Sequence, residues 1–266
     1  MKIFFRELYR GFVGKECLQL AANISFCALL SLIPMLMIGV AAAGYLLGGT
    51  EEVYSHLIRS VTHVLPQGKE LILANLEEVM RNWHQLGLWG LGILLFISTL
   101  LFGAIERALN KIFVAAKGRN FFHSRLMAVG LILLFSILFF LPILASIMET
   151  SLARFGFTFP LSDFLHGAFY RPLFSFVAFL VVLKVVPTHP IRFRYVLAGG
   201  VVFVLGVSLT RRLFFLYLGY AFNQYNIIFG SLAALVLLIL WIYYLSLVLL
   251  IAALVAKTLQ MSHVKR

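Results

Sequence analysis

The chain of 266 residues is 62% hydrophobic and 12% charged, with a mean hydropathy of +1.00. An average soluble domain is roughly 25% charged, so this composition excludes a soluble globular fold and indicates an integral membrane protein. The formal net charge of +12 does not indicate a nucleic-acid partner, because the cations gather at the ends of apolar runs and form no continuous basic face.

An amphipathic helix is predicted ahead of the first apolar run. Cations recur every four residues, at Lys2, Arg6 and Arg10. The opposite face carries apolar side chains at helical spacing: Phe5, Leu8, Tyr9, Phe12 and Val13. The pattern predicts an interfacial helix on the cytoplasmic leaflet, with its cations in contact with anionic lipid headgroups.

Six transmembrane helices are predicted from apolar runs near the roughly 20 residues that a bilayer requires. They cover about residues 18–48, 86–105, 126–148, 169–187, 195–220 and 227–256. The chain ends and even-numbered connections hold 15 Lys and Arg residues, and the odd-numbered connections hold 5. Because cations concentrate in cytoplasmic segments, both termini are expected in the cytoplasm. We expect residues 1–266 to form a single polytopic, all-α membrane domain.

Two further amphipathic helices are predicted in the first outside connection, residues 49–85. The break between them is Pro66-Gln67-Gly68. The apolar stripes on either side are Val53, Leu57, Val61, Val64 and Leu65, then Leu71, Ile72, Leu76, Val79 and Met80. These helices either cap the bundle or lie on the outer leaflet.

Arg211 and Arg212 interrupt the fifth predicted span about fifteen residues from its start, roughly 22 Å along the helix. A cation in hydrocarbon costs roughly 2.5–3.5 kcal/mol on insertion scales, so intramembrane arginines often mark a functional site. One interpretation is a site for an anionic group, such as a lipid phosphate or a substrate carboxylate, beside an internal chamber. The other is that both side chains reach the nearer headgroups and anchor the helix.

The first span has a polar face, with Asn23, Cys27 and Ser31 spaced four residues apart and Pro34 following. A helix kinked by proline and polar on one face suits a solute path that lines a cavity. The same residues equally suit hydrogen bonds between packed helices.

Three more polar residues are candidates at the ends of spans. Glu106 and Asn110 share a helical face where the second span ends. They suit a cytoplasmic gate or a proton-linked carboxylate, or alternatively a capped interfacial helix end with local ion pairs. Lys184, at the end of the fourth span, is expected to reach the inner-leaflet headgroups.

Catalytic and metal-binding patterns are missing from the sequence. The seven histidines have no metal-ligand spacing, and there is no Gly-x-Ser-x-Gly, Walker-type or Gly-x-Gly-x-x-Gly motif. Cys17 and Cys27 suit neither a disulfide framework nor a metal site. We expect no enzyme activity, no cofactor and no metal.

Several blocks of residues resemble the YihY/BrkB family of bacterial inner-membrane proteins. They are Ala21 to Phe26 with Leu30 to Pro34, Glu106 to Phe113, Pro187 with Arg192 to Gly200, Arg212 to Tyr217, and Tyr225 to Ala234 with Leu240 to Tyr243. The block that begins at Tyr225 is the most characteristic. It supplies three further candidates for cavity lining, Tyr225, Asn226 and Ser231.

The resemblance implies six transmembrane spans and localisation to the inner membrane, but it implies no settled activity. Where the family usually has an acidic residue late in the sixth span, this chain has Ala253, so a proton-coupling role does not carry over to that position. In the first span, this chain has Phe26-Cys27 at the position where the family usually has two aromatic residues. The family has carried a ribonuclease label, which no metal-binding carboxylate or histidine set supports in this sequence.

Three functions follow from these observations. The first is transporter-like handling of an anionic amphiphile, a phospholipid or envelope lipid, with Arg211 and Arg212 as headgroup ligands. The second is a secondary transporter or channel for a small solute, and the third is a non-transporting envelope scaffold or assembly factor. The expected partners are membrane lipids. Gly199, Gly200 and Gly206 permit close helix contacts, either within one bundle or in a homo-oligomer.

Overall fold

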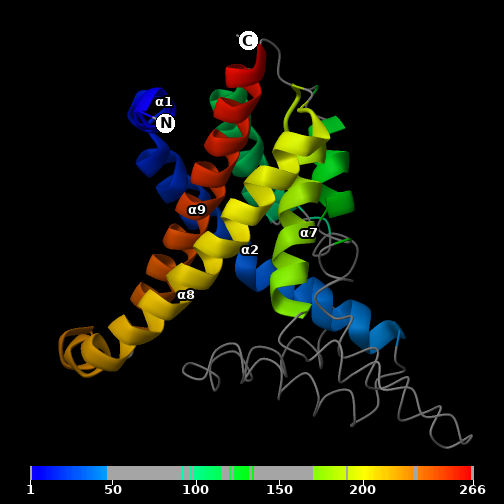
Figure 1. Cartoon of the computed structure of the whole chain (residues 1–266). Coiled ribbons are helices and arrows are strands. Elements are labelled where there is room, and N and C mark those ends of the chain that lie inside the picture. Colours follow the sequence, from blue (N-terminus) through cyan, green and yellow to red (C-terminus); the bar gives the residue numbers. More distant parts are fainter. Residues whose placement is uncertain are drawn as a thin grey trace, which may run out of the picture. The chain divides into compact units, whose positions relative to one another are not determined.

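The structure, a computed structural model, describes residues 2–46, 92, 96–97, 99–114, 120, 123–131, 134, 170–189, 191–229 and 233–264. The labelled helices in Figure 1 are α1 (Lys2–Gly14), α2 (Cys17–Leu46), α7 (Tyr170–Val185), α8 (Phe193–Phe229) and α9 (Ala233–Val264). Residues 99–113 and 123–131 form two more helices, and no strand occurs in the ranges given above. The all-α class predicted from the sequence is therefore confirmed.

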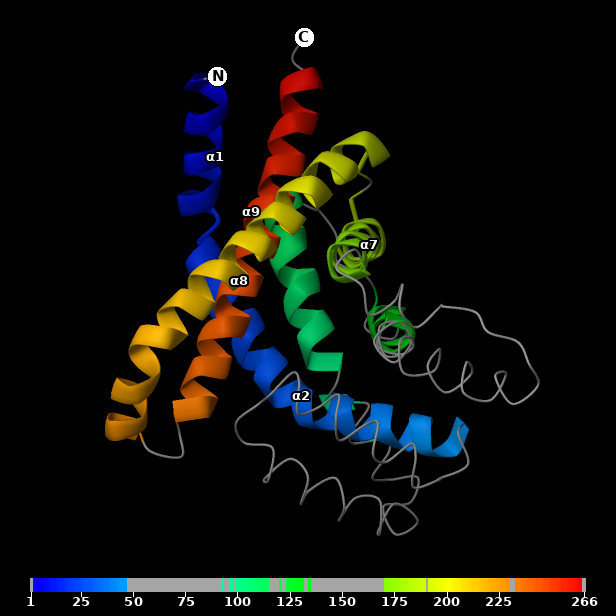
Figure 2. The ribbon, with the colours of Figure 1, turned by 60° about the horizontal axis from the view of Figure 1, so that its bottom comes forward.

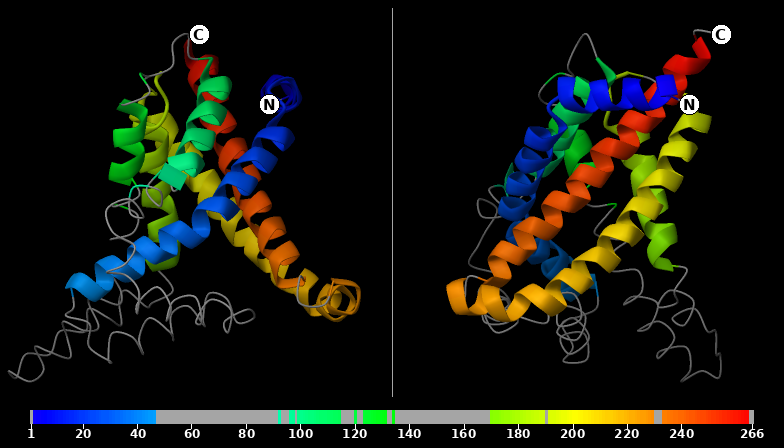
Figure 3. Two further views of the ribbon diagram at one scale, coloured as in Figure 1. Left: turned by 180° about the vertical axis from the view of Figure 1, so that it is seen from behind. Right: turned by 60° about the vertical axis from the view of Figure 1, so that its left-hand side comes forward.

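The chain divides into two compact units. Unit 1 contains residues 1–29, 100–128 and 172–266, and unit 2 contains residues 30–99 and 129–171. In unit 1, α8 and α9 form the main helix pair (Figure 2), and α1 packs against the C-terminal part of α9 (Figure 3). The first and last helices of the chain therefore lie side by side at one end of this unit.

Glycines on α8 allow this close packing. A Cβ atom on Gly199 would lie 3.0 Å from the carbonyl oxygen of Ala252 in α9, and one on Gly206 would lie 2.6 Å from Val248 Cγ1. A Cβ atom on Gly200 would meet the ring of Phe176 in α7 at 2.6 Å. Small residues let helix backbones approach each other, and here all three glycines do so within one unit of one chain.

Two described helices are long and apolar enough to cross a membrane, over Phe193–Tyr217 and Val236–Ser262. Only 28% of each apolar window is buried, so both segments expose apolar surface, as lipid-facing helices do. Shorter apolar helices cover Cys17–Ser31 and Pro172–Val185. The number of six spans stays a prediction.

The boundary predicted between the last two spans is wrong. The sequence predicts a connection over residues 221–226 and a sixth span from 227, but α8 continues unbroken to Phe229 and α9 begins at Ala233. Asn223, Gln224 and Asn226 suggest a loop by composition. However, residues 218–229 include no proline, so every residue there keeps the backbone N–H group that a continuous helix needs.

The second predicted span also ends later than expected. Its helix continues from residue 99 to 113, past the predicted end at 105, and Val114 follows with a φ of 55°. The helix persists because Ala108, Leu109, Ile112 and Phe113 are buried at helical spacing on one face. Glu106 and Asn110 both lie on this helix, as their predicted shared helical face requires.

Other predicted elements agree with the structure or lie outside the described residues. The first and fourth spans predicted at 18–48 and 169–187 correspond to α2 and α7. α2 is helical through Pro34, whose side chain is outside the described part. The two helices predicted in residues 49–85 are outside it as well.

Candidate functional site

The C-terminal half of the 99–113 helix carries a row of polar contacts within unit 1. Its buried apolar face fixes the helix in the unit, and its polar groups then bond to four other segments. The participating groups on this helix are the side chains of Glu106, Asn110 and Lys111 and the carbonyl of Ile112. We call this row the polar hub.

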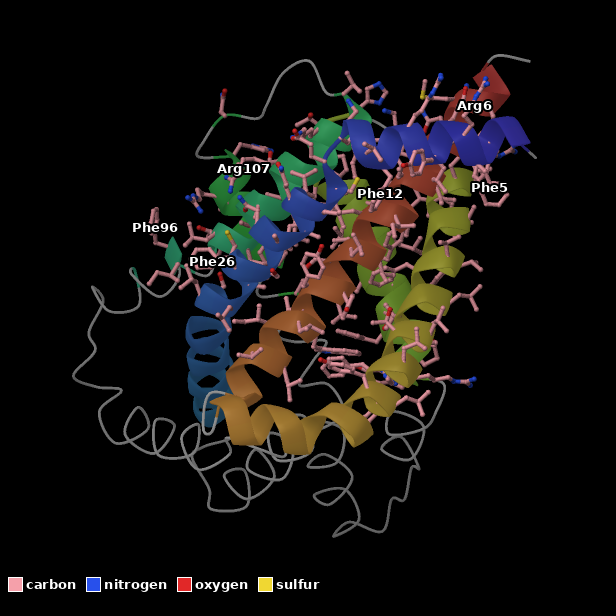
Figure 4. All side chains as sticks on the ribbon, turned by 90° about the vertical axis from the view of Figure 1, so that its left-hand side faces the viewer. Phe5, Arg6, Phe12, Phe26, Phe96 and Arg107 are labelled. Carbon is pink, nitrogen blue, oxygen red and sulfur yellow. The ribbon has the colours of Figure 1, made fainter. Side chains whose placement is uncertain are left out.

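Glu106 is the buried member of the hub. Its side chain is only 8% exposed, and its carboxyl Oε2 accepts a hydrogen bond from the Ser124 hydroxyl on the 123–131 helix. A buried carboxyl group is costly unless it is hydrogen-bonded, so this bond stabilises Glu106 inside the unit. The neighbouring Arg107 is exposed and labelled in Figure 4.

Asn110 holds the segment that follows α7. Its Oδ1 accepts two hydrogen bonds from Thr188, one from the backbone N–H at 3.0 Å and one from the hydroxyl at 3.1 Å. One side-chain oxygen therefore fixes both the backbone and the side chain of a residue 78 positions away. The sequence brings Glu106 and Asn110 to one face, and the structure shows that each bonds to a different segment.

Two lysines complete the hub. Lys111 Nζ pairs with Glu16 in the corner between α1 and α2, where Glu16 has a φ of 56°. Lys257 Nζ on α9 donates to the carbonyl of Ile112 at 2.7 Å and so satisfies one of the last carbonyls of that helix. The hub therefore ties the α1–α2 corner, the 123–131 helix, the segment after α7, and α9 to a single helix end.

The Glu16–Lys111 pair predicts a small, acid-sensitive contribution to stability. The hydrogen bond and charge of Lys111 lower the pKa of the exposed Glu16 carboxyl. A lowered folded-state pKa stabilises the fold above the ordinary glutamate value of about 4.3, and this stabilisation is lost as the pH falls through the lowered value. We expect Glu16→Gln to lower the melting temperature slightly at pH 7, with the difference from the parent shrinking as the pH falls below about 4.3. A difference that stays constant across this pH range would contradict the prediction.

The polar face of α2 forms local and packing contacts. Cys27 Sγ donates to Asn23 Oδ1 at 3.6 Å, and Asn23 is exposed. Within unit 2, Ser31 is fully buried, and its hydroxyl donates to the carbonyl of Ile97 at 3.0 Å. These bonds agree with helix packing, the second interpretation of this face, and the solute path stays a prediction.

Arg211 and Arg212 differ in their surroundings. Arg211 is half-buried, whereas Arg212 is exposed on an apolar face of α8. Three leucines share this face of α8, and their side chains are 59–74% exposed: Leu205, Leu209 and Leu216. Neither arginine lines the cavity between α2 and α9. The anion site proposed for the pair stays a prediction.

The cations expected at the inner leaflet lie on α1 and α7. Arg6 and Arg10 are exposed on α1, beside Phe5 and Tyr9, which are 61% and 70% exposed (Figure 4). The predicted amphipathic helix is therefore present as α1, and the rest of unit 1 leaves part of its apolar face exposed. Lys184 is also exposed, but its Nζ donates to the carbonyl of Ile191 at 2.8 Å.

The remaining candidates cannot be placed as site residues. The backbones of Tyr225 and Asn226 belong to α8, but their side chains lie outside the described residues, as does that of Lys2. Ser231 lies wholly outside them. Among the residues described, no group of three or more His, Cys, Asp or Glu side chains could hold a metal ion.

Comparison with known proteins identifies the family. The family model described as virulence factor BrkB matches residues 8–266, nearly the whole chain. The chain belongs to the YihY/BrkB family. This confirms the resemblance drawn from the blocks at Glu106 and Tyr225.

The chain is similar to curated bacterial proteins that are named UPF0761 membrane proteins. One from Legionella pneumophila (strain Corby) is 25% identical over 266 residues, which cover 99% of this chain and 63% of the relative. One from Idiomarina loihiensis is 29% identical over 204 residues, with 74% and 70% covered. One from Aliivibrio salmonicida is 27% identical over 265 residues, with 96% and 83% covered.

These comparisons establish an integral membrane protein of the family. The chain spans less than two thirds of the length of the Legionella relative. Neither the family description nor these names state an enzymatic activity or a substrate. No solved structure matches the chain.

Proposed function

We propose that this protein handles an anionic amphiphile, a phospholipid or envelope lipid, in the bacterial inner membrane in a transporter-like manner. The observation that carries the proposal is the position of Arg212, an exposed cation among exposed leucines on a helix long enough to cross the membrane. Such a cation needs an anionic partner, and the lipid phosphate is the anion most abundant around a membrane-spanning helix.

The depth of Arg212 suits a headgroup near the far side of the membrane from the start of α8. Nineteen residues separate Phe193 from Arg212, which corresponds to about 28 Å along an unbroken helix. The hydrocarbon core is roughly 30 Å thick, so the guanidinium lies close to one of its boundaries if α8 crosses with little tilt. A guanidinium can bind a phosphate through two parallel hydrogen bonds, which a lysine cannot do.

A second set of cations would serve the opposite leaflet. Arg6 and Arg10 on α1 are exposed, and α1 lies beside the C-terminal part of α9. That arrangement supports the proposal that both termini face the cytoplasm, where anionic lipids attract basic helices. A lipid headgroup would then meet cations at both membrane surfaces.

Single arginine variants test this proposal. We expect Arg212→Leu to lower several-fold the phospholipid that remains bound to purified protein, measured by native mass spectrometry. Arg211→Leu, the same substitution at the half-buried neighbour, should have a smaller effect, and Arg212→Lys an intermediate one, because lysine keeps the charge but not the paired hydrogen bonds.

Other outcomes would favour the alternative functions. Unchanged bound phospholipid in Arg212→Leu and in the double leucine variant would overturn the proposal. Solute uptake or ionic current in reconstituted vesicles would instead favour a small-solute transporter or channel. Crosslinking to one fixed partner without lipid movement would favour a scaffold.

A further inference from the structure

A groove of about 440 Å³ lies between α2 and α9 within unit 1. One wall comes from α2, with Ala22, Ser25, Phe26 and Leu29, and the other from α9, with Val236, Ile239, Leu240 and Tyr243. On both helices the lining residues follow the spacing i, i+3, i+4, i+7, so each wall is one continuous helical face. Phe26, labelled on α2 in Figure 4, is 62% exposed.

The surface of the groove is almost entirely apolar, although two of its lining residues, Ser25 and Tyr243, carry hydroxyl groups. The Ser25 hydroxyl donates to the carbonyl of Ala22 at 2.8 Å, so its proton is already used within α2. The sequence has no charged residue from Cys17 to Leu46 or from Ala233 to Ala256. The nearest charges along the two helices are Glu16 and Lys257, about 9 Å from Ala22 and about 21 Å from Tyr243. A charged or strongly polar ligand would therefore lose its hydration without compensation.

The groove is a short, open feature on helices of the membrane-spanning type. Its lining from Ala22 to Leu29 is about 10 Å long. One wall belongs to the apolar helix over Cys17–Ser31 and the other to the apolar helix over Val236–Ser262, which is long enough to cross a membrane. The apolar molecules that surround such helices in a bilayer are lipid acyl chains.

We propose that this groove holds one acyl chain of a membrane lipid. The site lies on apolar, membrane-type helices, its volume is within the roughly 300–1,000 Å³ usual for small-molecule sites, and its walls match hydrocarbon in polarity. The proposal rests on the lipid handling proposed above and adds the site that recognises the tail. Neither the groove nor its residues overlap with Arg211 or Arg212.

Photocrosslinking of a lipid tail tests the groove. The protein is reconstituted in vesicles of phosphatidylethanolamine and phosphatidylglycerol that contain a phosphatidylglycerol with a diazirine midway along one acyl chain. After illumination, mass spectrometry should locate crosslinks on the α2 and α9 peptides that line the groove. Ala22→Trp should lower these crosslinks several-fold, because the indole fills the space between the walls. Ala28→Trp, the same change on α2 outside the lining, should preserve them.

A second variant and a second readout separate the possible failures. Val236→Phe fills the groove from α9 and replaces Ala22→Trp if that variant does not fold. A diazirine-labelled diacylglycerol, which has no charged headgroup, should label the groove equally in the parent and in Arg212→Leu.

If filling variants leave crosslinks unchanged while Arg212→Leu lowers bound phospholipid, the groove proposal is wrong and the headgroup proposal stands. If filling variants abolish crosslinks while Arg212→Leu has no effect, the headgroup proposal is wrong and the groove stands. Crosslinks spread evenly over all lipid-facing helices would overturn the groove as a site.

Discussion

Asn110→Leu is expected to lower the free energy of unfolding by about 1–3 kcal/mol, the cost of leaving partly buried donors without partners. The Asn110 Oδ1 atom accepts from both the backbone N–H and the hydroxyl of Thr188, so leucine leaves two donors unpaired. Thermal unfolding of the purified protein in detergent measures this loss. Limited proteolysis should at the same time show faster cleavage near Thr188, since this contact fixes the segment between α7 and α8.

Two matched variants locate the cause of that loss. Thr188→Val removes the hydroxyl but keeps the backbone N–H bond at 3.0 Å, so it should cost less than Asn110→Leu. Asn110→Asp keeps an acceptor oxygen at the same place and should preserve most of the stability. If Thr188→Val and Asn110→Leu destabilise the protein equally, the backbone bond contributes nothing and Asn110 holds this segment through the Thr188 hydroxyl alone. Unchanged stability of Asn110→Leu would mean that the hub does not hold this segment through Asn110.

The helical class and many helix positions could be predicted because hydropathy acts locally along the chain. Long apolar runs must satisfy their backbone groups internally, so the sequence alone indicates α2 and α7 within a few residues. The N-terminal helix was equally predictable from its regular alternation of cations and apolar residues. The end of α8 was not, because Asn and Gln lower helix propensity only slightly and no proline forces a break.

Partners in the polar hub could not be predicted, because no local pattern connects them. Glu106 and Asn110 were candidates by their shared helical face, whereas their partners Ser124 and Thr188 lie 18 and 78 residues away. Small hydroxyl residues carry no sequence signal of their own outside caps and turns. Only tertiary packing determines which of them meets a given carboxylate or amide.

The groove and the arginine pair show a related limit. Helical spacing gives the angle of Arg212 around α8, but it does not say whether that side faces a chamber or the surroundings. The groove residues from Ala22 to Leu29 have the same spacing as an ordinary lipid-facing or packed surface. Apolar periodicity predicts that a face is apolar, and the neighbouring helix decides whether a cavity remains beside it.

Gly199→Leu is expected to destabilise the protein by about 1–3 kcal/mol or more, because it overpacks the contact between α8 and α9. A Cβ atom at this position would lie 3.0 Å from the carbonyl oxygen of Ala252 and 3.1 Å from Ala256 Cβ. A backbone carbonyl within a helix cannot rotate away as a flexible side chain can. The two helix backbones must therefore move apart at this contact by at least a few tenths of an ångström, and the rest of the leucine side chain needs further space. Thermal unfolding in detergent should show a clear loss of stability.

Gly130→Leu is the matched control for this substitution. Gly130 is also helical, and a Cβ atom there meets no atom within 4 Å, so leucine should be accommodated with little loss. Gly200→Leu should fall between the two, because its obstacle is the ring of Phe176, a side chain that can shift. This order, with Gly199 the most sensitive, follows only if α8 packs on α9 through its backbone. Equal stability of the Gly199 and Gly130 variants would mean that the two helices do not approach closely at Ala252, and the helix pair that carries both Arg212 and one wall of the groove would have to be placed differently.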